Sequence, residues 1–296
     1  MSKCAACGKG GDGLKTCTAC KLVKYCNATC QKTHRPVHKK ECKRRAAELH
    51  DEVLFKDPPP RAECPICTLP LPLDYDGQHY QSCCGKVLCD GCIHAAINAD
   101  SRGLCPFCRT SCHTTEEEWI ERMKKRAEGN DARAIRNLGG FYRDGRYGLP
   151  QDHDKGMKLW HRAGALGCSA TYFDIADSYR QGIGVERDVK KAKHYYELAA
   201  MAGIVPARHN VGNLERIAGN LDRAMKHWMI SAGAGWDESL ERIKGGFMCG
   251  IVTKEDFEKA LRAHKAANDE TKSDQRAAAA AHLKRFGYLS HQITQL

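Results

Sequence analysis

From about Glu116 onward, apolar residues recur every three or four positions among Ala, Lys, Arg and Glu, with glycines between the runs. This period predicts amphipathic helices joined by short turns. The same half of the chain also repeats itself, because five columns of similar residues advance together in steps of 36, 32 and 36 positions. These columns are Trp160/Tyr196/Trp228/His264, Asp152/Asp188/Asn220/Asp256, Lys155/Lys191/Arg223/Lys259, Gly156/Ala192/Ala224/Ala260 and Ala163/Ala199/Ser231/Ala267.

Each column has a physical role in a helical hairpin. The Asp/Asn column supplies oxygens expected to cap a helix N-terminus, and the small column lets two helices approach closely. The aromatic column is expected to fill the core between repeats. The first helix of each hairpin carries Leu138, Ile175, Val211 and Ile243. Tyr142, Tyr179 and Phe247 follow four residues later, and Glu215 interrupts that set. Gly182 and Gly184 lie in an interhelical loop, since no strand precedes them as a phosphate-binding loop would require.

Leu138-Gly139, Tyr142, Gly145 and the run Gly182-Ile183-Gly184-Val185 with Lys191-Ala192 resemble the Sel-1-like repeat, a relative of the tetratricopeptide repeat. The resemblance covers roughly residues 131–267 in four copies. It implies an α-solenoid whose concave surface binds a protein ligand. We expect Ser273–Phe286 to form a capping helix that covers the last repeat.

The first third of the chain is organised by cysteine instead, since 15 of its 18 cysteines lie between Cys4 and Cys108. Two clusters of some 40 to 45 residues are too short to fold on apolar burial alone. In a reducing compartment metal binding is favoured over disulfides, and structural zinc contributes on the order of 10–16 kcal/mol of binding free energy. Between the clusters we expect a helix over 43–56 and a semi-rigid linker at Asp57-Pro58-Pro59-Pro60.

The first cluster contains four ligand pairs, which are Cys4-x2-Cys7, Cys17-x2-Cys20, Cys26-x3-Cys30 and His38-x3-Cys42. Eight ligands predict two tetrahedral zinc sites, against the alternative of buried or redox-active thiols. The order resembles the MYND zinc finger. That resemblance implies one zinc held by Cys4, Cys7, Cys26 and Cys30, and a second held by Cys17, Cys20, His38 and Cys42. Arg35 replaces a tryptophan of the family's peptide-binding region, which puts peptide binding by that mode in question.

The second cluster contains Cys64-x2-Cys67, Cys83-Cys84, Cys89-x2-Cys92 and Cys105-x2-Cys108. It resembles a RING finger, which implies one zinc on Cys64, Cys67, Cys89 and Cys92, and another on Cys84, Cys105 and Cys108. Lys86 stands where a RING histidine ligand normally lies, and a protonated lysine has no lone pair to offer. For the fourth ligand we favour Cys83, because a thiolate is the better ligand for structural zinc, and His79 and His94 are the alternatives.

In the RING family a surface docks a ubiquitin-conjugating enzyme, and the matching positions here are Ile66, Pro106, Phe107 and Arg109. Their residue types suit a ubiquitin ligase, but many RING-like modules only hold proteins together. Ligase and scaffold therefore both remain open at this point.

Other classes of function find less support. The sequence contains no nucleophile elbow, His-Glu-x-x-His pair or phosphate loop, and the helical hairpins have no counterpart of the methyltransferase domain of some MYND proteins. The net charge of +11 and Lys43-Arg44-Arg45 prompt a nucleic-acid-binding hypothesis. However, thiolates and Zn²⁺ together lower that charge to about +4, so we do not expect specific DNA binding. No apolar run is long enough for a membrane span, and the start does not resemble a signal peptide.

The sequence thus predicts a mainly α protein, an α-solenoid of helical hairpins preceded by two small zinc-stabilised α+β modules. The expected segments are a MYND-type finger at 1–45, a helix and linker at 46–62, a RING-like finger at 63–112, the solenoid at 116–270, and a capping helix and tail at 271–296. We expect about four Zn²⁺ per chain, protein or peptide partners, and a cytoplasmic or nuclear location. The predicted function is a protein-interaction adaptor, with a RING-type ubiquitin ligase as the alternative.

Overall fold

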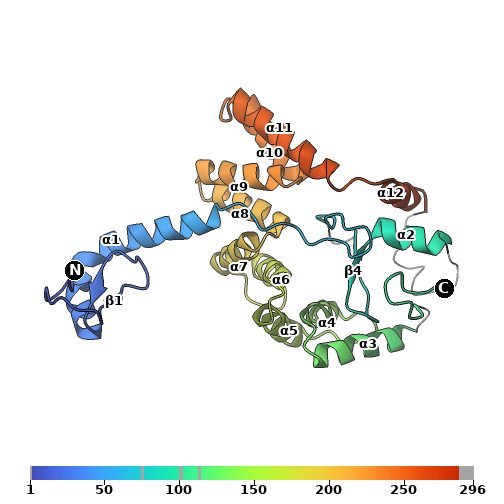
Figure 1. The fold of residues 1–296 in the computed structure, drawn as a ribbon, viewed down its shortest axis with the longest axis horizontal. Coiled ribbons are helices and arrows are strands. Elements are labelled where there is room, and N and C mark those ends of the chain that lie inside the picture. The colour runs from blue at the N-terminus through green and yellow to red at the C-terminus, as the bar shows by residue number, and fades with distance from the viewer. Residues whose placement is uncertain (1, 75–76, 100–102, 113–114, 287–296) are drawn as a thin grey trace. The chain divides into compact units, whose positions relative to one another are not determined.

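A computed structural model describes residues 2–74, 77–99, 103–112 and 115–286. The expected fold class is confirmed, because these residues form a chain of helices with only two short β-hairpins (Figure 1). The chain separates into two compact units, 1–56 and 57–296, and each is described by itself. The bounds of the five expected segments stay predictions, and residues 287–296 of the expected tail lie outside the described residues.

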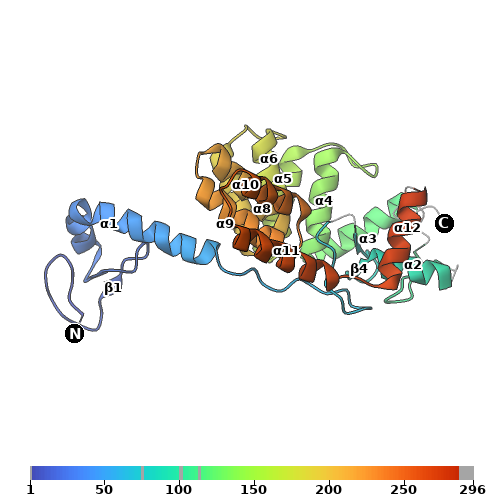
Figure 2. The ribbon, with the colours of Figure 1, turned by 90° about the horizontal axis from the view of Figure 1, so that it is seen from above.

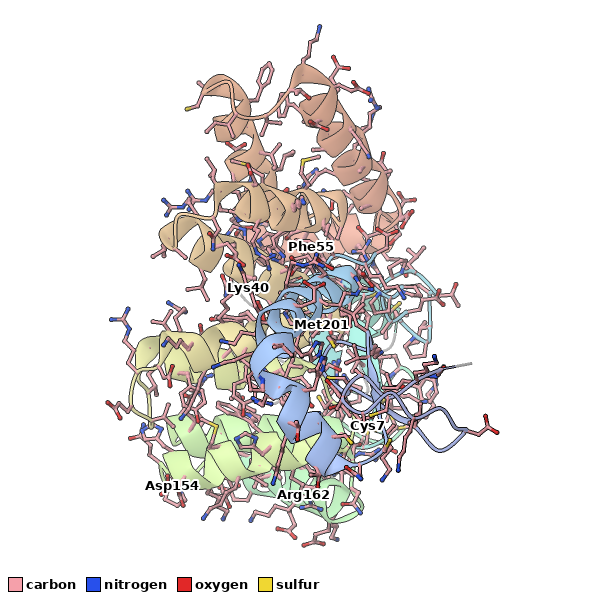
Figure 3. All side chains as sticks on the ribbon, turned by 90° about the vertical axis from the view of Figure 1, so that its left-hand side faces the viewer. Cys7, Lys40, Phe55, Asp154, Arg162 and Met201 are labelled. Carbon is pink, nitrogen blue, oxygen red and sulfur yellow. The ribbon has the colours of Figure 1, made fainter. Side chains whose placement is uncertain are left out.

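The first unit holds the first cysteine module and one long helix. Strands β1 (Lys15–Thr16) and β2 (Lys24–Tyr25) pair in antiparallel fashion and precede α1 (Ala28–Leu54). The helix begins well before the 43–56 range that we expected, because the side chain of Asn27 accepts a hydrogen bond from the backbone N–H of Cys30 and caps it. Figure 3 shows Lys40 on this helix, Phe55 at its end and Cys7 in the module.

The second cysteine module opens the second unit. Strands β3 (Gln78–Tyr80) and β4 (Val87–Cys89) form an antiparallel hairpin, with His79 opposite Leu88. Helix α2 (Asp90–Ala99) follows directly, and Leu88, Cys89, Cys92 and Ile93 are buried where strand meets helix. The small core has the cysteines at its centre, so its folding depends on what those cysteines bind.

After this module in the chain, α3 (Glu116–Glu128) precedes four helical hairpins (Figures 1 and 2). The hairpins are α4 (Ala132–Asp144) with α5 (His153–Ala165), α6 (Ala170–Gln181) with α7 (Val189–Met201), α8 (Val205–Ile217) with α9 (Leu221–Gly233), and α10 (Asp237–Met248) with α11 (Lys254–Asp269). Trp160, Tyr196 and Trp228 are almost fully buried, so the aromatic column forms the core as expected.

In the first three hairpins the aromatic column packs against a small residue on the first helix. A Cβ placed on Gly139 would lie 2.6 Å from the Trp160 ring, and one on Gly212 would lie 2.5 Å from the Trp228 ring. The second hairpin has Ala176 and the smaller Tyr196 at the matching places, in one core cluster. Ring size and the small residue facing it are therefore matched, as close packing requires.

The expected capping column is correct in only two of its four members. Asp152 accepts a hydrogen bond from the backbone N–H of Lys155, and Asp188 accepts from those of Lys190 and Lys191. Asn220 makes no such cap, because its side-chain amide donates to Glu215 instead. In the fourth hairpin the cap is Thr253, three residues before Asp256.

Helix α12 (Asp274–Phe286) differs most from expectation. We expected it to cover the last repeat, but it packs against α2 of the second cysteine module. The two helices approach closely because α12 is rich in alanine and because Gly91 of α2 has no side chain. A Cβ placed on Gly91 would lie 2.8 Å from the backbone nitrogen of Arg276. Within the second unit, the module therefore lies between the two ends of the solenoid (Figure 1).

Candidate metal centres and an adjoining groove

Two cysteine-rich tetrads lie in the first module. The structure brings together Cys4, Cys7, Cys26 and Cys30 in one group, and Cys17, Cys20, His38 and Cys42 in another. The last two ligands of the second group, His38 and Cys42, lie one turn apart on α1. Helix α1 also carries Cys30 of the first group, so one element positions ligands for both. These are the two interleaved groups that the MYND resemblance implies.

Two further tetrads lie in the second module, Cys64/Cys67/Cys89/Cys92 and Cys83/Cys84/Cys105/Cys108. Cys83 therefore lies with Cys84, Cys105 and Cys108, as the favoured prediction for the fourth ligand requires. The two alternatives are engaged elsewhere, because the His79 ring pairs with Asp90 and the His94 ring lies 5.1 Å from that of His282. The positive φ of Gly85, +72°, turns the backbone directly after the two adjacent cysteines.

The donor sets and distances fit Zn²⁺. In each tetrad all ligand atoms lie within 4.8 Å of one another. Tetrahedral Zn–S bonds of about 2.3 Å place two sulfurs about 3.8 Å apart. The Sγ atoms of Cys64 and Cys92 are 3.8 Å apart, as are those of Cys67 and Cys89. Four protein ligands complete each site, which is the closed arrangement of structural zinc.

Backbone amides favour the thiolate form of one cysteine in each of two tetrads, the form that a metal needs. A hydrogen bond from the backbone of Cys7 lowers the pKa of the Cys4 thiol to about 6. Burial opposes ionisation of Cys64, but backbone donors at Cys67, Cys89 and Ile66 lower its pKa to about 7. The protein is thus a zinc-binding protein with about four sites, while the assignment of each side chain to an ion stays a prediction.

The repeats support the second module through residues that the spacing of cysteines does not reveal. Arg126 of α3 donates to the Tyr80 hydroxyl and to Asp131, each over 2.9 Å, and Tyr80 donates to Asp131 over 2.7 Å. Arg126 also donates to the carbonyl of Cys83 over 3.4 Å. Burial and the Asp131 carboxylate raise the pKa of Tyr80 far above its usual value. The module is therefore fastened to the start of the solenoid.

A groove of about 280 Å³ crosses the second module beside its zinc sites. It is lined by Ile66, Pro106, Arg109, the α2 alanines and Gln275 of α12. Three of the four expected docking residues meet here. The fourth, Phe107, is outside the lining and has Lys86 Nζ 5.5 Å from its ring centroid. Lys86, which stands at the missing histidine, thus contacts an exposed aromatic ring.

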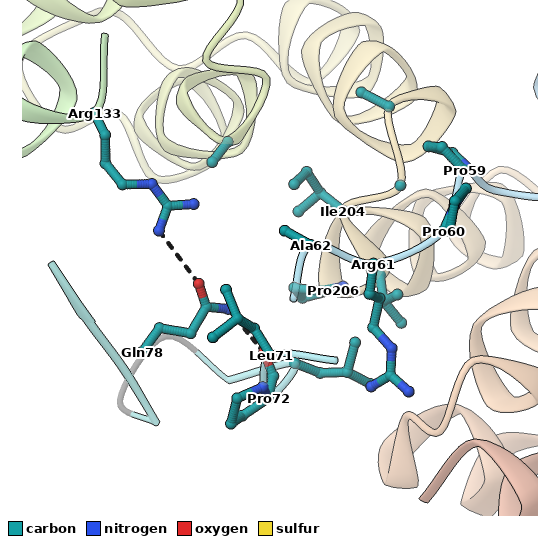
Figure 4. Close-up of a pocket in the computed structure, with 15 residues that line it drawn as sticks. Pro59, Pro60, Arg61, Ala62, Leu71, Pro72, Gln78, Arg133, Ile204 and Pro206 are labelled. Carbon is teal, nitrogen blue, oxygen red and sulfur yellow. Dashed lines mark hydrogen bonds between the residues drawn. The ribbon is translucent and has the colours of Figure 1, made fainter. Parts of the chain in front are cut away.

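The proline linker lies against the solenoid in the second unit (Figure 4). Pro59 contacts the turn between α7 and α8, where a Cβ on Gly203 would lie 3.1 Å from its ring. Arg61 donates to the carbonyl of Ala267 near the end of α11. A cavity of about 260 Å³ remains beside the linker, and Gln78 joins Arg133 across it over 3.3 Å. The linker is therefore held against the solenoid at the turn between α7 and α8 and near the end of α11.

Comparison with known proteins identifies two kinds of module. Residues 4–42 match the MYND finger family, and residues 132–168 and 169–204 match the Sel1 repeat. A human protein described as "Histone-lysine N-methyltransferase SMYD3" is 48% identical over 40 residues. That match covers 14% of this chain and 9% of the human protein. The chain therefore contains a MYND finger and Sel1 repeats, and its resemblance to this relative ends with the finger.

Two solved structures resemble the solenoid. A Sel1 repeat protein from Oxalobacter formigenes gives a TM-score of 0.46 at 26% identity, over 51% of this chain and 64% of that one. A protective antigen of uropathogenic Escherichia coli with an SLR fold gives 0.44 at 25% identity, over 52% and 33%. This chain thus spans less than two thirds of each. Among the described residues, no helix is long and apolar enough to cross a membrane.

Proposed function

We propose that this protein is a zinc-dependent adaptor that brings partner proteins together through its MYND finger, its second cysteine module and its repeats. The observation that carries this proposal is the combination of four closed tetrads with a helical repeat array. Closed sites stabilise folds and leave no open position for hydrolysis. Repeat arrays and small zinc modules present surfaces that bind other proteins. The compartment consistent with free thiols is the cytoplasm or nucleus.

Exposed apolar side chains indicate where the surfaces are. Val37 on α1 is 76% exposed, and Ile66 in the groove is 42% exposed. Arg35 lies on α1 two residues before Val37, in the region where many MYND fingers carry a tryptophan. Charge rather than an aromatic ring would then select a peptide at this finger, so its ligand differs from that of fingers with the tryptophan.

The adaptor proposal is tested by separating the surfaces. Full-length Val37→Glu and Ile66→Ala variants are tagged, and their co-purifying proteins are quantified by mass spectrometry. We expect each variant to lose a different subset of partners while keeping about four zinc per chain. If both variants retained every partner of the unmodified protein, the adaptor role of these two surfaces would be rejected.

A ubiquitin ligase is the second candidate, favoured by the convergence of Ile66, Pro106 and Arg109 on one groove. In this mechanism the module would hold a conjugating enzyme and would contribute no nucleophile. We expect auto-ubiquitination by the full chain with some conjugating enzymes, reduced at least about tenfold by Ile66→Ala.

Leu261→Ala is the matched control for that assay, because Leu261 is about as exposed as Ile66 but lies on α11, outside the groove lining. Its activity is expected to stay near that of the unmodified protein. Silence across a broad panel of conjugating enzymes, with zinc fully bound, would leave the adaptor as the function of this module.

A further inference from the structure

Helix α12 meets the second cysteine module at one of its metal sites. The Arg276 guanidinium donates over 2.8 Å to the carbonyl of Pro70 and over 3.5 Å to that of Leu69. Its Nη2 also lies 3.6 Å from the Sγ of Cys67, a member of the first tetrad of the module. A residue more than two hundred positions from Cys67 in sequence thus contacts both this cysteine and the turn after it.

The charges in this contact are complementary. Four thiolates and one Zn²⁺ carry a net charge of about −2, which the partly buried Arg276 cation beside them stabilises. The guanidinium is held in this position by its hydrogen bonds to the carbonyls of Pro70 and Thr271, over 2.8 Å and 3.0 Å. Hydrogen bonds from a fixed donor to thiolate ligands stabilise the ligand set and orient it.

The shape of the contact is equally specific. Gly91 allows the backbone of α12 to approach α2, and a Cβ there would lie 2.8 Å from both the nitrogen and Cγ of Arg276. Ala279 of α12 is fully buried. The ring of His282 lies 5.1 Å from that of His94 on α2. The neighbouring Gln275 lines the groove that contains Ile66 and Arg109.

We infer that α12 is an integral part of the second cysteine module, with Arg276 a positioning residue for its Cys64/Cys67/Cys89/Cys92 zinc site. Zinc binding and docking of α12 then stabilise each other. The groove beside the site is composite, because one wall comes from the far end of the chain. This inference depends on zinc binding and is independent of the adaptor and ligase proposals.

The test is zinc release from the full-length protein to a chromogenic chelator, with Arg276→Ala, Arg276→Lys and Lys284→Ala compared. Lys284 is the matched control, since it is an exposed cation on the same helix. We expect Arg276→Ala to release one zinc per chain roughly tenfold faster than the unmodified protein, as for other partners of metal ligands. Arg276→Lys keeps the charge but loses the planar fork, so its release rate should be intermediate.

Hydrogen exchange gives an independent readout of the same coupling. The amides of α12 should exchange faster in Arg276→Ala, and also in the unmodified protein after one zinc per chain has been withdrawn. Lys284→Ala should match the unmodified protein in both measurements. Equal zinc-release rates for Arg276→Ala and Lys284→Ala would overturn the inference. Equal exchange rates of the α12 amides before and after withdrawal of one zinc per chain would overturn it as well.

Discussion

At the scale of single residues, Glu215 is the side chain that departs furthest from its column. The other hairpins carry Tyr or Phe at this place, and the sequence showed Glu215 only as an interruption. The structure buries it completely and surrounds it with donors. Arg223 lies 2.8 Å away, Asn220 2.8 Å and Lys193 3.0 Å. An ion-pair network thus replaces an aromatic ring, and it explains why Asn220 does not cap its helix.

This network predicts a large effect for a single substitution. Burial alone would raise the pKa of Glu215, but Arg223, Asn220 and Lys193 lower it to about 2. Glu215→Ala would remove the buried carboxylate that Arg223 and Lys193 share and should lower the free energy of unfolding by about 3 kcal/mol at pH 7. Urea unfolding followed by tryptophan fluorescence measures this. The exposed neighbour Arg216→Ala should change the free energy little.

The pH dependence has a definite sign. Because the folded pKa of Glu215 lies below its ordinary value of 4.5, the carboxylate contributes stability above pH 4.5 and loses it as the pH falls toward 2. The difference in stability between the unmodified protein and Glu215→Gln should therefore shrink across that range. A difference that stayed constant from pH 6 to pH 3 would contradict this account.

At the scale of helices, the pairing of ring size with a small facing residue was only partly visible in the sequence. The aromatic column predicts a buried ring, and Trp160, Tyr196 and Trp228 are buried. The partner glycines, Gly139 and Gly212, lie on the preceding helix, and their contact depends on how two helices cross. Periodicity reports which face of a helix is apolar but not the distance between helices, so it did not reveal this match.

The match can be tested within this chain. Gly212→Ala places a methyl group 2.5 Å from the Trp228 ring and should destabilise the third hairpin by about 1–3 kcal/mol. The double variant Gly212→Ala/Trp228→Tyr copies the Ala176–Tyr196 pair and should recover much of that loss. Thermal unfolding of the single and double variants measures the recovery. A double variant less stable than Gly212→Ala alone would reject the matching of sizes.

At the scale of the whole protein, the spacing of Cys and His was sufficient to predict the ligand pairs, because pairs separated by two or three residues are local features. The grouping of the pairs came from the family resemblances, and the fourth partner of Cys84, Cys105 and Cys108 stayed open. The placement of α12 was not predictable in the same way. Its alanines suit a close contact with any small-faced helix, and nothing local distinguishes α11 from α2. The second cysteine module is contacted by Arg276, Arg126 and Gln275, whose roles depend on how elements distant in sequence pack together.

These contacts predict that removing zinc lowers the stability of the helical repeats, although the predicted zinc ligands lie outside them. All four tryptophans lie at or beyond residue 119, so fluorescence reports on the solenoid. A strong chelator should lower its unfolding midpoint by about 5 °C, which corresponds to about 2 kcal/mol. Cys17→Ser/Cys20→Ser, which removes ligands only from the first unit, should leave the midpoint unchanged. An unchanged midpoint under full chelation would mean that the module and the repeats unfold independently.

An ordinary repeat array is free at both ends and can flex or stretch like an open spring. In this chain Arg126 joins the second cysteine module to the helix before the array, and Arg276 joins it to the helix after the array. Arg61 of the linker that precedes the module contacts α11. Both ends of the array are therefore connected to the same module, which limits how far the array can bend or extend. A partner that extended the array would first strain the contact between Arg276 and the turn after Cys67. Mechanical load on the repeats would therefore change the rate at which the module releases zinc.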